Sequence, residues 1–171
     1  MLMCGENMAA RALCIGLFIF AMSGFSSAVA QSETRISRFS EKPVPRFESL
    51  RKDKVYGRRG PSFEHPIDWT YARAGLPVMV IKESPSWCRV RDPDGVEVWI
   101  HKRLLSTKAT GITNQDALLK RGTQPESEDL AILKPGIIVD VLDNLDGMVK
   151  VRAGGLTGWV SASHVWGHSG V

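Results

Sequence analysis

The chain has 171 residues, a formal net charge of +4 and 43% hydrophobic residues, which is an ordinary composition for globular domains. Beyond residue 30 the only cysteine is Cys88, which excludes an internal disulfide in that part of the chain. The sequence contains no aromatic and basic platform of the kinds that bind nucleic acid, so we expect no nucleic-acid partner.

The first thirty residues are predicted to be a cleavable signal peptide. Residues 12–25 form an apolar run, and Ala28 and Ala30 present the small side chains that signal peptidase requires. The mature chain is then expected to begin at Gln31. A retained membrane anchor is the alternative, but the run is shorter than the roughly 20 residues that a bilayer span needs. The sequence therefore predicts an exported protein, periplasmic or extracellular, with no transmembrane anchor in the mature chain.

Residues 31–45 are predicted to be a flexible tether. They are polar, they lack apolar periodicity, and they end in Pro43-Val44-Pro45. We expect no hydrophobic core to depend on this segment.

The rest of the chain is predicted to hold two copies of one small module, over residues 46–108 and 109–171. Gly and Trp residues recur in both copies at nearly the same spacing. Gly60 precedes Gly75 by 15 residues and Trp99 follows Gly75 by 24, whereas the matching intervals between Gly122, Gly136 and Trp159 are 14 and 23. A period of about sixty residues indicates two duplicated domains and not one large core.

Short alternating apolar runs follow in each module. In the first they are Leu76, Val78 and Val80, then Cys88 and Val90, then Val96, Val98 and Ile100. Alternation with a period of two is typical of half-buried strands, and turn residues at 92–95 and 153–155 separate the last two runs in the two copies. The sequence therefore predicts an all-β protein made of two small antiparallel barrels, since closure hides the edges of a sheet.

The spacing also predicts which positions correspond between the copies. Trp69 and Tyr71 are aligned with Leu130 and Ile132, Trp87 with Met148, and Cys88 with Val149. Cys88 thus falls on an apolar strand position, where an inert core thiol is expected.

The two copies differ in charge. Residues 46–108 contain 13 basic and 8 acidic residues, a balance of +5, whereas residues 109–171 contain 5 and 7, a balance of −2. A basic module suits an anionic partner such as a cell-wall polymer or a lipid surface, although +5 is also ordinary for a small domain.

The first copy contains four landmarks in order: Val55-Tyr56-Gly57-Arg58-Arg59-Gly60-Pro61-Ser62, the strand after Gly75, then Trp87, then Trp99-Ile100. These landmarks resemble the bacterial SH3-like domain, SH3b. The second copy, from Ala117 through Gly122 to Gly158-Trp159-Val160, is similar but more degraded. The resemblance implies two β-barrels of SH3 type and a targeting or protein-interaction role in the cell envelope.

Two departures from the SH3b pattern lie in the first copy. Gly57 stands where the family commonly has an apolar residue, and Val98 replaces the Gly before Trp99.

Exposed aromatic and basic residues of the first module are the binding candidates, because aromatic side chains bury large area at little entropic cost. The predicted groove residues are Tyr56, Phe63, Arg58, Arg59, Arg73 and Trp87. The competing interpretation places Trp69, Trp87 and Trp99 in the core, and it is the favoured one for these three.

Catalytic chemistry finds little support. Cys88 and His101 are the only pair that suggests a hydrolase, yet Cys88 is predicted to lie in a strand and not at a helix start. His164 and His168 have no accompanying ligand cluster, so neither a metal nor another cofactor is expected.

The sequence therefore favours a non-enzymatic binding protein that recognises a peptide, peptidoglycan or an envelope protein. A cell-wall hydrolase accessory or minimal Cys hydrolase, and a structural partner subunit without its own ligand, are the alternatives.

Overall fold

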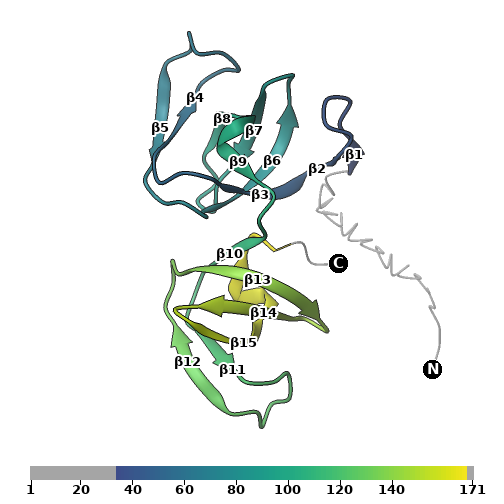
Figure 1. The fold of residues 1–171 in the computed structure, drawn as a ribbon, viewed down its shortest axis with the longest axis vertical. Coiled ribbons are helices and arrows are strands. Elements are labelled where there is room, and N and C mark those ends of the chain that lie inside the picture. Colours follow the sequence, from purple (N-terminus) through teal and green to yellow (C-terminus); the bar gives the residue numbers. More distant parts are fainter. Residues whose placement is uncertain (1–33, 169–171) are drawn as a thin grey trace, which may run out of the picture. The chain divides into compact units, whose positions relative to one another are not determined.

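The computed structural model describes residues 34–168 (Figure 1). The predicted signal peptide, with Ala28 and Ala30, and the expected first mature residue Gln31 lie outside these residues. The described part of the chain is all-β, with two short 3-10 turns and no α-helix, as the sequence predicts. A search of this part for a helix long and apolar enough to span a membrane finds none.

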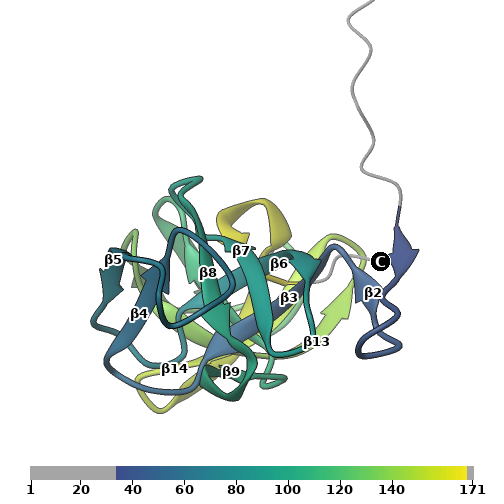
Figure 2. The same cartoon turned by 90° about the horizontal axis from the view of Figure 1, so that it is seen from above.

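The first module is built on one seven-stranded antiparallel sheet with the order β5-β4-β8-β7-β6-β3-β9. Its strands are β3 (Arg46–Leu50), β4 (Val55–Arg58), β5 (Ile67–Tyr71), β6 (Pro77–Glu83), β7 (Trp87–Arg91), β8 (Glu97–His101) and β9 (Leu105–Ser106). The 3-10 turn η1 (Lys102–Leu104) connects the last two strands. Figure 2 shows β8, β7, β6 and β3 side by side in this order.

The second module repeats that order, with the sheet β12-β11-β15-β14-β13-β10-β16. Its strands are β10 (Thr110–Thr113), β11 (Ala117–Lys120), β12 (Asp129–Leu133), β13 (Ile138–Leu145), β14 (Met148–Ala153), β15 (Leu156–Ser161) and β16 (Val165–Trp166). The 3-10 turn η2 (Ala162–His164) precedes the last strand. The shared topology confirms that the chain holds two copies of one fold.

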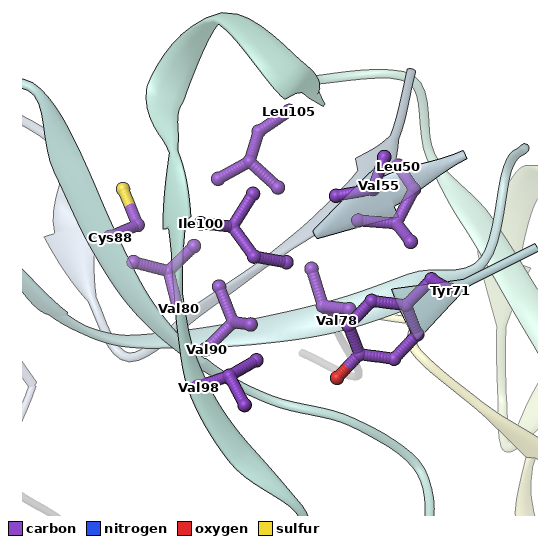
Figure 3. Packing of buried hydrophobic residues seen from close by; sticks show 10 residues of the cluster. All are labelled: Leu50, Val55, Tyr71, Val78, Val80, Cys88, Val90, Val98, Ile100 and Leu105. Carbon is purple, nitrogen blue, oxygen red and sulfur yellow. The ribbon is translucent and has the colours of Figure 1, made fainter. Parts of the chain in front are cut away.

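Each sheet encloses its own hydrophobic core, because alternate side chains of every strand point to the same side. The first core gathers ten buried residues, among them Val78, Val80, Val90, Val98 and Ile100 (Figure 3). The second core gathers nine buried residues of the second sheet: Ala117, Leu119, Leu133, Val139, Val149, Val151, Ala153, Val160 and Val165. The alternating runs of the sequence are therefore the inward-facing rows.

The strand register corrects one predicted correspondence. Val55 pairs with Tyr71 in the first module and Ala117 pairs with Leu133 in the second, so Tyr71 matches Leu133 and not Ile132. By the same register Trp69 matches Ala131 and not Leu130. The prediction was wrong by one residue because the extra residue of the first copy lies in the turn after β5, between Tyr71 and Gly75, and not in the loop before that strand.

The segment predicted to be a flexible tether forms a β-hairpin over its described part. Strands β1 (Arg35–Ile36) and β2 (Pro43–Val44) pair antiparallel, and Val44 is only 3% exposed. The hydroxyls of Ser37 and Ser40 donate hydrogen bonds to the carboxylate of Glu83 on β6. The sequence gives no apolar signal here because one valine and two hydroxyl groups make the attachment. We call residues 34–45 the N-terminal hairpin.

Candidate functional site

An aromatic cluster lies on the surface of the first module, centred on Phe63. Phe63 belongs to the loop between β4 and β5 and is 58% exposed. Its ring meets the edge of Trp87 at a centroid distance of 4.9 Å and stacks on His101 at 5.6 Å with an interplanar angle of 20°. Trp87 and His101 are themselves 5.2 Å apart, because they are paired across β7 and β8.

Two arginines complete the aromatic cluster. The guanidinium carbons of Arg58 and Arg103 each lie 5.7 Å from the centroid of the Phe63 ring. A guanidinium at this distance is attracted by the negative face of an aromatic ring. The result is an exposed apolar ring with two positive charges beside it. We call Phe63, Trp87, His101, Arg58 and Arg103 the aromatic cluster.

The loop that presents Phe63 is held by local hydrogen bonds. Arg58 Nη1 donates to the carbonyl oxygens of Phe63, at 3.0 Å, and of His65, at 2.6 Å. Ser62 Oγ and His65 Nδ1 lie 2.8 Å apart. An aromatic side chain that is fixed before binding loses less conformational entropy when a ligand covers it.

The ring of His101 is oriented by the turn that follows β8. The backbone N–H of Arg103 donates to His101 Nδ1 at 3.2 Å. Burial lowers the pKa of His101, and the charge of Arg103 lowers it further. The imidazole is therefore kept neutral at neutral pH, so the two arginines provide the positive charge of the cluster.

The structure brings together three of the six predicted groove residues, Phe63, Arg58 and Trp87. Trp87 serves the core as well, since it is only 6% exposed. Sequence reasoning missed His101 and Arg103 as members. The signal was available, because Trp87 and His101 end neighbouring strands of a predicted hairpin, but it depended on the strand register.

The other three predicted groove residues lie elsewhere. Tyr56 is 39% exposed and has the amine of Lys54 over its ring at 5.4 Å. Arg59 forms an exposed ion pair with Asp68 at 3.0 Å. Arg73 Nη2 donates to the carbonyl oxygen of Gly136 at 2.8 Å. None of these contacts involves Phe63.

Of the tryptophans expected in the core, Trp69 and Trp99 are exceptions. Trp99 is half-buried, because it alternates along β8 with the inward-facing Val98 and Ile100. Trp69 is 46% exposed on the edge strand β5. This exposed position agrees with the corrected register, which matches it to the small Ala131.

The second module serves as an internal comparison. Its strand register, in which Lys120 pairs with Trp159 and Met148 with Ser161, shows which residues occupy the cluster positions. In the order Phe63, Trp87, His101, Arg58 and Arg103, they are Pro125, Met148, Ser161, Lys120 and Ser163. Since the second barrel forms without these aromatic residues, the fold does not require them. A feature that the fold does not require is a candidate for function.

Cys88 lies in the core, as expected, and its chemistry is that of an unreactive thiol. Burial raises its pKa to about 12, and the neighbouring charge of Glu83 contributes to the rise. Its thiol donates to Glu83 Oε1 at 3.8 Å. The ring of His101, the other member of the suggested hydrolase pair, stacks on Phe63. The residues from 34 to 168 contain no group of three His, Cys, Asp or Glu side chains that could hold a metal ion.

Comparison with solved structures finds remote likenesses. "Structure of NlpC2 from Trichomonas vaginalis" is 15% identical, with a TM-score of 0.33 over 71% of this chain and 47% of that chain. "Structure of NlpC1 from Trichomonas vaginalis" is 15% identical, with a TM-score of 0.33 over 77% of this chain and 48% of that chain. The matches thus span about half of those chains, and at this TM-score they support no functional argument.

No curated protein matches the sequence. The bacterial SH3 domain matches it twice, over residues 51–107 and 115–167. These ranges fall on the two seven-stranded sheets and cover more than half of the chain. The protein therefore belongs to the bacterial SH3 domain family.

Proposed function

We propose that this protein is a non-catalytic binding protein whose first module recognises its ligand at the aromatic cluster. The observation that supports this most directly is Phe63, a large apolar side chain that is 58% exposed although Trp87 and His101 hold its ring in place. Aromatic side chains of this kind are frequent anchors of binding surfaces.

The chemistry of the cluster favours a ligand with an apolar group beside a carboxylate. The face of Phe63 offers a stacking surface, and a guanidinium matches the geometry of a carboxylate through paired hydrogen bonds. Short peptides with a free carboxyl end, including the peptide part of peptidoglycan, and segments of envelope proteins have both features. Membership of the fold family alone does not select among them.

A shallow surface cluster gives modest affinity. Phe63 is 58% exposed, and small contact areas do not offset the entropy lost on binding by a large margin. Attachment to a polymer with many repeated ligands raises the effective affinity of such a module. An exported location, periplasmic or extracellular, is part of this proposal and is supported by the leader-like composition of residues 1–30.

The burial of Cys88 disfavours the hydrolase alternative. A nucleophilic cysteine needs an accessible thiolate, whereas the pKa of this thiol is raised by burial and its sulfur is covered. We therefore assign no catalytic role to the pair of Cys88 and His101.

The proposal is tested by retention of the purified protein on isolated cell wall and on immobilised envelope extract. Phe63→Ala should weaken retention roughly tenfold, since it removes the stacking surface. Arg103→Gln should weaken it to a smaller extent, because one of two guanidiniums remains.

Tyr56→Ala is the matched control, since Tyr56 is also an exposed aromatic residue of the first module but lies outside the cluster. It should leave retention unchanged. Failure of both fractions to retain the wild type, or equal losses in Phe63→Ala and Tyr56→Ala, would contradict the proposal.

A further inference from the structure

A polar pocket lies in the first module, away from the aromatic cluster. It has a volume of about 250 Å³ and is lined by the N-terminal hairpin, by β3 and by the segment after β8. Four basic side chains line it, namely Lys42, Arg46, Arg51 and Lys102. No residue of the aromatic cluster is part of its lining.

The charges of this pocket do not balance. Glu48 and Glu83 are its two carboxylates, and Arg46 is bonded to both of them. Lys102 Nζ lies 3.7 Å from Glu83, whose side chain is only 1% exposed. Among the ion pairs of residues 34–168, none involves Lys42 or Arg51. Four positive and two negative groups leave a net charge of +2 over a buried floor, and such concave surfaces concentrate anions.

The second module shows that the barrel does not need these charges. Phe47 pairs with Met79 in the first sheet, and Thr110 pairs with Asp140 in the second. Because Met79 corresponds to Asp140, Phe47 corresponds to Thr110. The positions of Arg46, Glu48, Arg51, Glu83 and Lys102 are then occupied by Ala109, Gly111, Asn114, Asn144 and Ala162. All five charged residues are replaced by uncharged ones, and the second sheet nevertheless has the same strand order.

Attachment of the N-terminal hairpin explains only part of the charged set. Glu83 accepts hydrogen bonds from Ser37 and Ser40 of that hairpin and is neutralised by Arg46. The side chains of Lys42 and Arg51 take no part in this network. Both side chains are exposed at the rim of the pocket, where their charges are open to a ligand.

We propose that this pocket binds a phosphate group. Arg51 offers a planar guanidinium and Lys42 and Lys102 offer ammonium groups, and both kinds of donor bind phosphate oxygens. Ser106 and Thr107 add hydroxyl groups to the lining. The volume is several times the roughly 30 Å³ that one water molecule occupies, so the pocket can admit a tetrahedral anion.

The phosphate can come from a lipid headgroup or from a soluble or polymeric ester, since both present the same oxygens. This inference does not depend on the aromatic cluster. Phe63→Ala should therefore leave phosphate binding unchanged, so failure of the proposed function and failure of this inference can be told apart.

The test is a titration of the purified protein with inorganic phosphate at constant ionic strength, followed by amide chemical shifts. Saturable shifts are expected at the residues that line the pocket. The double variant Lys42→Gln/Arg51→Gln should weaken binding roughly tenfold or more, since it removes two charged donors. It leaves Glu83 and Arg46 in place, so an unchanged melting temperature shows that the fold persists.

The matched control is Lys52→Gln/Lys54→Gln, which lowers the net charge by the same amount at exposed positions outside the pocket. This control should bind phosphate like the wild type. Absence of saturable shifts in the wild type, or equal losses in the two double variants, would overturn the proposal in favour of a diffuse basic surface.

Vesicles identify the source of the phosphate. Sedimentation with phosphatidylglycerol vesicles but not with phosphatidylcholine vesicles, reversed by inorganic phosphate, supports an anionic lipid headgroup as the ligand. Binding of inorganic phosphate without sedimentation by either kind of vesicle supports a soluble or polymeric phosphate ester.

Discussion

Gly57 and Val98 share one position of the first core: a Cβ atom at Gly57 would overlap the side chain of Val98. The second module has the reverse arrangement, because Leu119 corresponds to Gly57 and Gly158 corresponds to Val98. A Cβ atom at Gly158 would lie 3.0 Å from two side-chain atoms of Leu119 and would also overlap the backbone oxygen of Lys120. The same space is thus filled from β8 in the first module and from β11 in the second. The two departures from the SH3b pattern, at Gly57 and at Val98, are therefore one compensated change.

This relationship predicts strong coupling between the two sites. Gly57→Leu alone should destabilise the protein by about 1–3 kcal/mol or more, because it overpacks the core against Val98. Val98→Gly alone should also destabilise it, since it leaves a cavity. The double variant Gly57→Leu/Val98→Gly should recover a large part of both losses, as measured by urea denaturation and a double-mutant cycle.

Gly57→Leu combined with Val90→Ala is the control for this cycle, since Val90 is buried in the same core without being the residue that a Cβ at Gly57 would meet. Its two losses should add. Equal coupling in both double variants would contradict the shared position.

Glu83 should control attachment of the N-terminal hairpin. Glu83→Gln keeps an acceptor for Ser37 and Ser40 but leaves the partly buried Arg46 without the charge of this partner. We expect a loss of about 1–3 kcal/mol and faster tryptic cleavage after Arg38 or Lys42. Glu97→Gln, which also removes a carboxylate from an ion pair but at a more exposed site, should change neither. Equal cleavage rates in wild type and Glu83→Gln would contradict this role.

The same carboxylate should give the fold an acid limit. Burial alone would raise the pKa of Glu83, but hydrogen bonds from Ser37, Ser40 and Arg46 outweigh it and lower the pKa from 4.5 to about 2. Because the folded-state pKa is lowered, the contribution to stability is present above pH 4.5 and is lost as the pH falls from 4.5 towards 2. The loss should reach about 3 kcal/mol at most. Thermal melts between these pH values should show a steeper decline for wild type than for Glu83→Gln.

Cys88 should be unreactive in the folded protein. A thiol with a pKa of about 12 has a negligible thiolate fraction at pH 8, and its burial blocks access. A disulfide reagent should label it only after denaturation. Rapid labelling of the native protein, or cell-wall hydrolysis that is lost in Cys88→Ser, would reopen the hydrolase alternative.

The sequence predicts the local part of the fold and misses what depends on register. Alternation at Val78 and Val80 is a local pattern, so it predicts β6 directly. The match of Tyr71 with Leu133 depends on where one extra residue is placed, and only the ladder of β4 and β5 decides that. The N-terminal hairpin escapes detection because hydroxyl groups attach it and no apolar pattern marks it.

The candidate site shows the same limit. Phe63 and Trp87 can be singled out as aromatic residues of the basic module, but the position of His101 beside both of them depends on its pairing with Trp87 across two strands. Charge alone groups Arg73 with Arg58, but the two side chains have unrelated partners. The sequence gives the type of each residue, but which side chains meet on one surface depends on the tertiary structure.

Tyr71 and Asp92 form a second compensated pair. The hydroxyl of Tyr71 donates to Asp92 Oδ2 at 3.2 Å, and Asp92 Oδ1 accepts from the backbone N–H groups of Asp94 and Val96 in the turn between β7 and β8. The second module has Leu133 and Ala153 at the two positions, so both members of the polar pair are absent together.

Tyr71→Phe should therefore cost about 1–2 kcal/mol, because it leaves a buried carboxylate with one partner fewer. Asp92→Ala should cost more, since it also removes the acceptor that closes the turn. The double variant Tyr71→Phe/Asp92→Ala should lose less stability than the sum of the losses of the two single variants, because neither polar group is then left buried without its partner. Simple additivity in urea denaturation would show that the bond contributes nothing, and that Asp92 acts only on the turn.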